Sequence, residues 1–229
     1  MAKKHIIDFE GFFNFLDKYH QKKIINFLKK YKIRYFIDVG SHKGEFLSYL
    51  IKLKYKKIFC FEPQKEIYKL LVNKFHKKKN ILFFNVGLGN HNKKKILHIN
   101  SLTSTSTFSE YKNNYFTFIK RLLLNSTKNS TNDYKVKIKK LDNCFKNYRI
   151  NDCLLKIDVE GYELEVLQGS LKSLKKKIKF VLIERQMLSQ YKSYDFKKIE
   201  LILKKNNFKL TKKFIYPTFH FQDILYKKE

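Results

Sequence analysis

Strand-like and helix-like segments alternate through most of this chain, and that alternation constrains its fold more than any other feature. Short apolar runs with the length of buried strands occur at 33–39, 58–61, 81–86, 154–157 and 180–183. Amphipathic helical patterns lie between or after them, at 43–53, through Leu70 to Phe75, at 164–174 and at 196–203. Such alternation predicts an α/β fold with a doubly wound, mainly parallel sheet.

The two ends of the chain and one internal segment depart from this pattern. Residues 1–32 repeat apolar side chains at helical spacing, which predicts a helical cap ahead of a main domain at 33–229. The lysine-rich outer face of that cap leaves membrane-surface contact as an alternative. Strand-like runs at 208–214 and 219–226 predict an antiparallel hairpin. Residues 100–133, rich in Ser, Thr and Asn with one helical stretch at 111–124, predict an insertion or lid, or a surface loop without a role.

The turn after the first strand carries an acid and two glycines, in the order Asp38-Val-Gly-Ser-His-Lys-Gly44. In an open parallel sheet, ligands bind beyond the carboxyl ends of the strands, so this turn faces the expected site. Gly40 permits close approach of a ligand to the backbone. A carboxylate at Asp38 would repel a pyrophosphate but suits a cationic ligand, and the spacing is not the G-x-G-x-x-G of dinucleotide sites.

The next two strands end in further polar residues. Glu62 follows the second strand and lies 22 residues beyond Gly40, close to the position at which an acid binds a ribose diol in such folds. Asn85 opens the loop after the third strand, which we expect on the adenine side. A ribose, an adenine and a positive charge together indicate S-adenosylmethionine as the cofactor.

Three more carboxylates follow the fourth and fifth strands. Asp158 and Glu160 come directly after the run at 154–157, and Glu184 follows the run at 180–183. Acids also cap helices, but three from two neighbouring strand ends exceed what capping needs. We expect them on the acceptor side, with His42, His98 and His220 as weaker candidate bases. A hard cation such as Mg²⁺ on the three carboxylates is an alternative; our primary interpretation assigns no metal.

Several segments, in order and spacing, resemble the FkbM-type family of S-adenosylmethionine-dependent methyltransferases. They are YFIDVGSHKGEF, CFEPQ, LDNCF, LLKIDVEGYELEVLQGS and FVLIE, and the resemblance covers roughly residues 33–185. The resemblance implies a class I Rossmann-like methyltransferase fold. It also implies transfer of a methyl group to a hydroxyl of a sugar, a glycan or a secondary metabolite.

The resemblance and the strand-end positions together assign roles to ten residues. We expect Asp38, Gly40, Ser41, Gly44, Glu62 and Asn85 to bind the cofactor. Asp158 is the first candidate for the base that takes the hydroxyl proton, and Glu184 is the second. Glu160 and Ser104, the latter in a hydroxyl-rich motif, are expected on the substrate side.

The net charge of +30 first indicates a nucleic-acid partner. All but four of the 50 basic residues are lysines, however, whereas readers of phosphates and bases favour arginine. We therefore expect a small-molecule or glycan acceptor. A nucleic-acid methyltransferase and a non-catalytic basic binding module on the same fold remain alternatives. Three cysteines without metal-ligand spacing and no long apolar stretch indicate a cytoplasmic protein without a transmembrane segment.

Overall fold

A computed structural model describes residues 9–100, 103–112, 133–187 and 191–229. Its centre is a seven-stranded sheet in the order β3-β2-β1-β7-β8-β10-β9. These strands are β1 (Tyr35–Val39), β2 (Lys57–Phe61), β3 (Ile81–Phe84), β7 (Cys153–Ile157), β8 (Ile178–Gln186), β9 (Phe208–Ile215) and β10 (Phe221–Lys228). The first five pair in parallel, and β10 pairs antiparallel with both β8 and β9. The predicted sheet and its C-terminal hairpin are confirmed.

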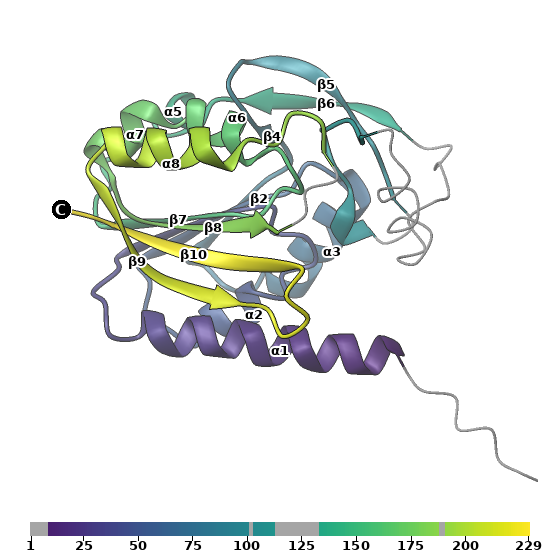
Figure 1. Ribbon diagram of the computed structural model, residues 1–229, viewed down its shortest axis with the longest axis horizontal. Helices are drawn as coiled ribbons and strands as arrows, with labels where there is room; N and C mark the ends of the chain where they lie inside the picture. The colour runs from purple at the N-terminus through teal and green to yellow at the C-terminus, as the bar shows by residue number, and fades with distance from the viewer. Residues whose placement is uncertain (1–8, 101–102, 113–132, 188–190) are drawn as a thin grey trace, which may run out of the picture.

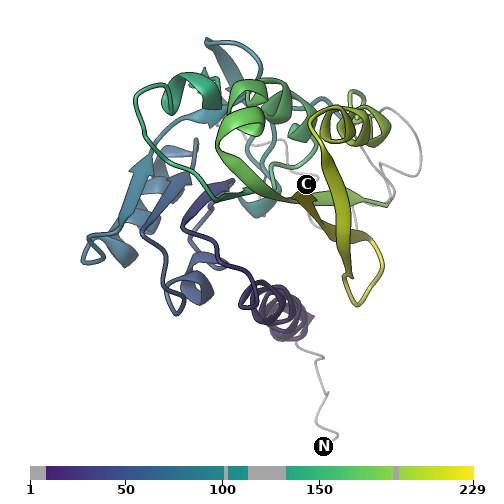
Figure 2. The same cartoon turned by 90° about the vertical axis from the view of Figure 1, so that its left-hand side faces the viewer.

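Helices cover both faces of this sheet (Figure 1). One face carries α1 (Phe9–Leu28), α2 (Leu47–Leu50) and α3 (Lys65–Phe75), and the other carries α5 (Leu141–Cys144), α6 (Glu163–Gln168), α7 (Leu171–Lys176) and α8 (Phe196–Lys205). Figure 2 shows the two layers after a 90° turn, with α1 in purple below the sheet and the green helices above it. Within the described residues, no helix is both long and apolar enough to cross a membrane.

Side-chain alternation along the buried strands sends residues to two cores. In β1, Ile37 joins the core under α5–α8, while Phe36 joins the core under α1–α3. Because alternate residues of a strand point to opposite faces, Asp38 shares the α1 face with Phe36. Leu154, Leu182 and Leu225 also belong to the core under α1–α3. Residues an even number of positions from them therefore lie on the same face, and these are Lys156, Asp158, Glu184 and Asp223. Period two therefore gathers the polar strand ends on one side of the sheet.

Two predicted helices differ from those observed. The pattern at 43–53 contains only α2, four residues long, set among turns. The pattern at 164–174 is two helices, α6 and α7, that are interrupted at Gly169 and Ser170. A Cβ at Gly169 would lie 2.0 Å from the carbonyl oxygen of Gly89, so the backbone passes too close there for any side chain. The apolar spacing continues across this break, which is why it indicated a single helix.

A second sheet of three strands was not predicted. It consists of β4 (Gly87–Leu88), β6 (Tyr134–Lys139) and β5 (Lys93–Leu97), in that order. A short 3₁₀ turn, η1 (Thr103–Thr105), follows β5. The small sheet and η1 border the segment expected as an insertion. The helical stretch expected at 111–124 lies outside the described residues from 113 onward.

Candidate active site

The turn after β1 is wedged between the ends of two neighbouring strands. The amides of Gly40 and Ser41 both donate to the carbonyl oxygen of Phe61, at the end of β2, over 3.1 Å. On the other side, a Cβ at Gly40 would lie 1.9 Å from the carbonyl oxygen of Asp158, and its φ of +83° also favours glycine. This is the topological switch point, because the chain turns from β1 toward β2 on one side and later adds β7 on the other.

Asp38 places a buried carboxylate at the start of this turn, and its hydrogen-bonding capacity is unused. The residue is 1% exposed, and among the described residues neither carboxylate oxygen has a hydrogen-bond partner. Burial raises the pKa of Asp38, and the ammonium of Lys156, 3.6 Å from Oδ1, opposes that rise. Ser41, also buried, donates its hydroxyl to the carbonyl oxygen of Asp38 over 3.0 Å. A buried acid with unused acceptor oxygens fits a ligand that brings its own cationic donor.

Glu62 holds the next position along the strand ends. Its Oε2 accepts from the amide of His42 over 2.9 Å, and its Oε1 accepts from the amide of Gln64 over 2.8 Å. Burial raises the pKa of Glu62 to about 7, although these amides stabilise the ionised form. The side chain of Asn85 donates to the carbonyl oxygens of Glu62 and Pro63, so it supports the backbone of this loop.

The hydroxyl-rich segment 103–107 contacts both the turn after β1 and the β7–α6 loop. At one end, His42 Nε2 lies 2.8 Å from Thr103 Oγ1. At the other end, the hydroxyl of Thr107 donates to the carbonyl oxygen of Glu160 over 2.5 Å. Ser104, predicted on the substrate side, lies in η1 between these contacts and is exposed. Gly44 is buried against Phe75 and Leu71, so it brings the start of the helical turns close to α3.

The carboxylates of Asp158, Glu160 and Glu184 converge, as expected from their places at the strand ends. One oxygen each from Asp158, Glu160 and Glu184 lies within 4.8 Å of the others. Lys156 Nζ lies 2.9 Å from Asp158 Oδ2. Burial, followed by the charges of Asp158 and Glu160, raises the pKa of Glu184 well above its usual value. Burial alone would lower the pKa of Lys156, but the acids around it raise that pKa overall.

Four polar residues around the carboxylates were missed by sequence reasoning. His20 Nε2, from α1, lies 2.8 Å from Oδ2 of Asp223, which pairs in register with Glu184. Gln186 Nε2 and the hydroxyl of Tyr191 both donate to Glu160 Oε2, over 2.9 and 3.0 Å. An acid inside the apolar run FQDILY was the available signal for Asp223. The contacts with His20 depend on how α1 docks, which no local pattern encodes.

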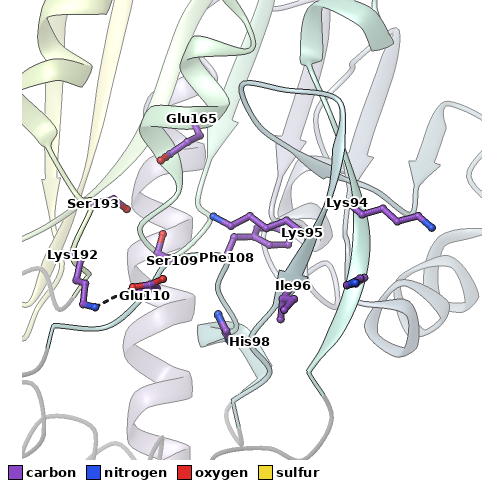
Figure 3. A pocket seen from close by; sticks show the side chains of 11 residues that line it. Lys94, Lys95, Ile96, His98, Phe108, Ser109, Glu110, Glu165, Lys192 and Ser193 are labelled. Atoms are coloured by element: carbon purple, nitrogen blue, oxygen red, sulfur yellow. Dashed lines mark hydrogen bonds and ion pairs between the residues drawn. The ribbon is translucent and has the colours of Figure 1, made fainter.

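A cavity of about 670 Å³ is lined by residues of β5, β6 and α6 and by the segments around Ser109 and Ser193 (Figure 3). The side chain of Lys95 extends toward Ser109 and Glu165, whereas Lys94 points away from them. Ser109 donates to the carbonyl oxygen of Gly161 over 2.8 Å, so the cavity wall is bonded to the loop that bears Glu160. Its lining residues are Lys94, Lys95, Ile96, His98, Phe108, Ser109, Glu110, Lys135, Glu165, Lys192 and Ser193.

Comparisons with solved structures agree with the fold. The FkbM methyltransferase of Methylobacillus flagellatus is 16% identical with a TM-score of 0.55, over 85% of this chain and 43% of that one. The chain thus spans less than half of that protein. Fibrillarin of Aeropyrum pernix with bound S-adenosyl-L-methionine is 10% identical, with a TM-score of 0.52, over 92% of this chain and 76% of that one. Magnesium protoporphyrin IX methyltransferase of Synechocystis PCC 6803 is 6% identical, with a TM-score of 0.56, over 100% and 87%.

The sequence comparison is more specific than these likenesses, which show the fold alone. No curated protein matches the chain. The profile of the methyltransferase FkbM domain, however, matches residues 38–210, which is most of the chain. This match begins at Asp38 and includes Glu62, Asp158, Glu160 and Glu184. The resemblance inferred from the sequence is confirmed, and the chain belongs to the FkbM methyltransferase family.

Proposed function

We propose that this chain is an S-adenosylmethionine-dependent O-methyltransferase acting on a hydroxyl of a sugar, a glycan or a secondary metabolite. One observation carries the proposal. The carboxylate of Asp38, which has no hydrogen-bond partner among the described residues, precedes the turn at Gly40. That turn packs directly against the backbone of Asp158, which belongs to the carboxylate cluster with Glu160 and Glu184. Family membership supports the reaction type, and this juxtaposition supports a cofactor and an acceptor meeting there.

The residues of the β1 turn fit the cofactor. Asp38 would bind its amino group, and the two oxygens of Glu62, each already accepting one backbone amide, would accept the two ribose hydroxyls. Gly40 lets the turn pack against the end of β7, Ser41 fixes the turn, and Asn85 supports the adenine-side loop. When bound, S-adenosylmethionine supplies an electrophilic methyl group on a sulfonium.

Asp158 is our proposed base for the acceptor hydroxyl. Lys156 holds its Oδ2, which fixes the carboxylate and leaves Oδ1 to meet the acceptor. The hydroxyl proton moves to that carboxylate as the oxygen becomes a nucleophile. Glu184 is the second candidate, and Glu160, held by Gln186 and Tyr191, would position the acceptor. Ser104 lies farther along the rim, and we propose that it contacts the outer part of the acceptor.

The basic cavity supports an acceptor that carries negative charge. Lysines outnumber acids among its lining residues, so an anionic glycan would be attracted to it. The same surface charge would favour an anionic membrane face. We place the reaction in the cytoplasm, and the free thiols of Cys60, Cys144 and Cys153 support a reducing compartment. A nucleic-acid acceptor and a non-catalytic module are the alternatives that the assay below distinguishes.

We expect transfer of tritium from methyl-labelled S-adenosylmethionine to a glycan fraction of cell extract. Replacing Asp158 by asparagine should lower the rate about tenfold or more while S-adenosylhomocysteine binding is kept, because Glu184 lies close enough to act in its place. Asp142→Asn serves as the matched control, since Asp142 caps the amides of Lys172 and Ser173 outside the site. Label that ribonuclease releases would indicate a nucleic-acid acceptor, and absence of any labelled product would favour the binding module.

A further inference from the structure

The three acceptor-side carboxylates have the spacing of a cation site. Three atoms within 4.8 Å of one another lie no more than about 2.8 Å from a common centre, whereas oxygen ligands lie about 2.0–2.1 Å from Mg²⁺ and about 2.3–2.6 Å from Ca²⁺. Small rotations of Asp158, Glu160 and Glu184 would bring the oxygens to these distances. All three donors are oxygens, which hard divalent cations prefer.

Glu184 supplies a second, independent indication of a ligand at this position. Its side chain comes from β8 rather than from the β7–α6 loop, and it is only 8% exposed. Within the described residues it has no hydrogen-bond donor, and the charged groups that most affect it are all acids, namely Asp158, Glu160, Asp223 and Glu163. A buried carboxylate among carboxylates is costly unless a cation or a proton neutralises it.

Gln186 adds another oxygen without a donor. Its amide nitrogen donates to Glu160, yet its Oε1 is buried and has no partner among the described residues. Because the two amide atoms share one carbon, this oxygen lies near the Glu160 carboxylate. A cation could bind this neutral oxygen together with the three acids, whereas an anion would be repelled by them.

Lys156 and His20, which lie beside the cluster, contact acids other than Glu184. Lys156 contacts Asp158 Oδ2 at 2.9 Å and Asp38 at 3.6 Å. His20 contacts Asp223 at 2.8 Å. Neither contacts Glu184, so among the described residues Glu184 has no cationic partner. The deficit is notable in a chain with a net charge of +30.

We propose that Asp158, Glu160 and Glu184 bind a divalent cation, Mg²⁺ or Mn²⁺, and that this cation holds the acceptor oxygen at the mouth of the site. The proposal rests on the proposed function and departs from the expectation that the site uses no metal. Octahedral coordination leaves positions for acceptor oxygens and water once the carboxylates are bound. A hydroxyl on the cation ionises more readily, which would ease the loss of its proton to Asp158, the base of the proposed function.

Electron paramagnetic resonance of Mn²⁺ tests this site without the acceptor or the cofactor. Added to metal-free full-length protein, Mn²⁺ should lose its free-ion signal with one equivalent bound, and Mg²⁺ should displace it. Glu184→Gln should weaken Mn²⁺ binding at least tenfold, and so should Glu160→Gln. Glu66→Gln, at an exposed acid paired with Lys69, should leave it unchanged.

Binding of S-adenosylhomocysteine in the same preparations separates the two proposals. If the wild type binds the nucleoside but no Mn²⁺, the cation site is wrong and the proposed function stands. If Mn²⁺ binds equally to wild type and to both site variants, the metal lies elsewhere and the proposal is overturned. If neither ligand binds, the proposed function itself fails. Retained nucleoside binding by Glu184→Gln shows that a loss of Mn²⁺ is not caused by unfolding.

Discussion

Glu62→Ala is expected to weaken S-adenosylhomocysteine binding by about a hundredfold to ten-thousandfold. Each ribose hydroxyl would donate to a charged acceptor, and such hydrogen bonds contribute about 1.5–3 kcal/mol each. The substitution also leaves the amides of His42 and Gln64 without the acceptors they have now. Isothermal titration calorimetry measures the change. Glu66→Ala, four residues further on and exposed, is the matched control and should bind as the wild type does.

The carboxylate of Glu62 should also make nucleoside affinity depend on pH. Burial raises the pKa of Glu62 to about 7, so the free protein takes up a proton there as the pH falls through that value. The ribose hydroxyls would donate to the ionised form, and binding must displace that proton. Affinity should therefore fall by up to about tenfold for each unit below pH 7 and level off above about pH 8. Glu62→Gln cannot ionise, and an unchanged slope in that variant would contradict the assignment.

Gly40→Ala is expected to disrupt the site through its backbone. The new Cβ would lie 1.9 Å from the carbonyl oxygen of Asp158, and that atom belongs to the backbone and cannot rotate away. The φ of +83° adds strain for any residue with a side chain. We expect a loss of about 3 kcal/mol or more in the free energy of unfolding. Nucleoside binding should be lost as well, because the turn must move away from β7.

Thermal unfolding of this variant is followed by circular dichroism. For a chain of this length, that loss corresponds to a fall in Tm of about 6–12 °C. Gly11→Ala is the control, since Gly11 is exposed within α1, and alanine in a helix should be neutral or stabilising by up to about 1 kcal/mol. A Gly40→Ala protein with wild-type Tm and wild-type binding would show that the turn is not packed against β7 as described.

The sheet and the strand-end residues could be predicted because buried parallel strands appear in the sequence as continuous apolar runs. β1 and β7 are buried at every position, so their apolar runs were unambiguous, and the residues that follow them had to lie at one edge. Asp38 and Asp158 were placed correctly at that edge for this reason. Their roles toward a cofactor and an acceptor remain predictions.

The strands of the small sheet have a weaker sequence pattern. β5 reads KKKIL, with most residues exposed, so it lacks an apolar run. β6 does alternate, burying Val136 and Ile138 between exposed lysines, and that period of two was the signal available. The strands pair across about forty residues, much of it polar, and no local pattern indicates such a distant partner.

The surroundings of Glu184 could not be predicted, because they arise from tertiary docking. Asp223 reaches Glu184 only through the register of the antiparallel pair β8 and β10. His20 reaches Asp223 only because α1 packs against the hairpin. The sequence identified the acids, but the spacing of the three oxygens, and the lack of a donor for Glu184 among the described residues, are properties of the assembled sheet.

Calorimetric titration of the wild-type chain with S-adenosylhomocysteine tests the central claim most directly. The positions of Asp38, Gly40 and Glu62 predict one equivalent bound, with affinity that weakens below pH 7 and is at least a hundredfold weaker in Glu62→Ala. Folded wild-type protein that binds neither S-adenosylhomocysteine nor S-adenosylmethionine would contradict the assignment of this switch point as a cofactor site, and with it the proposed methyl transfer.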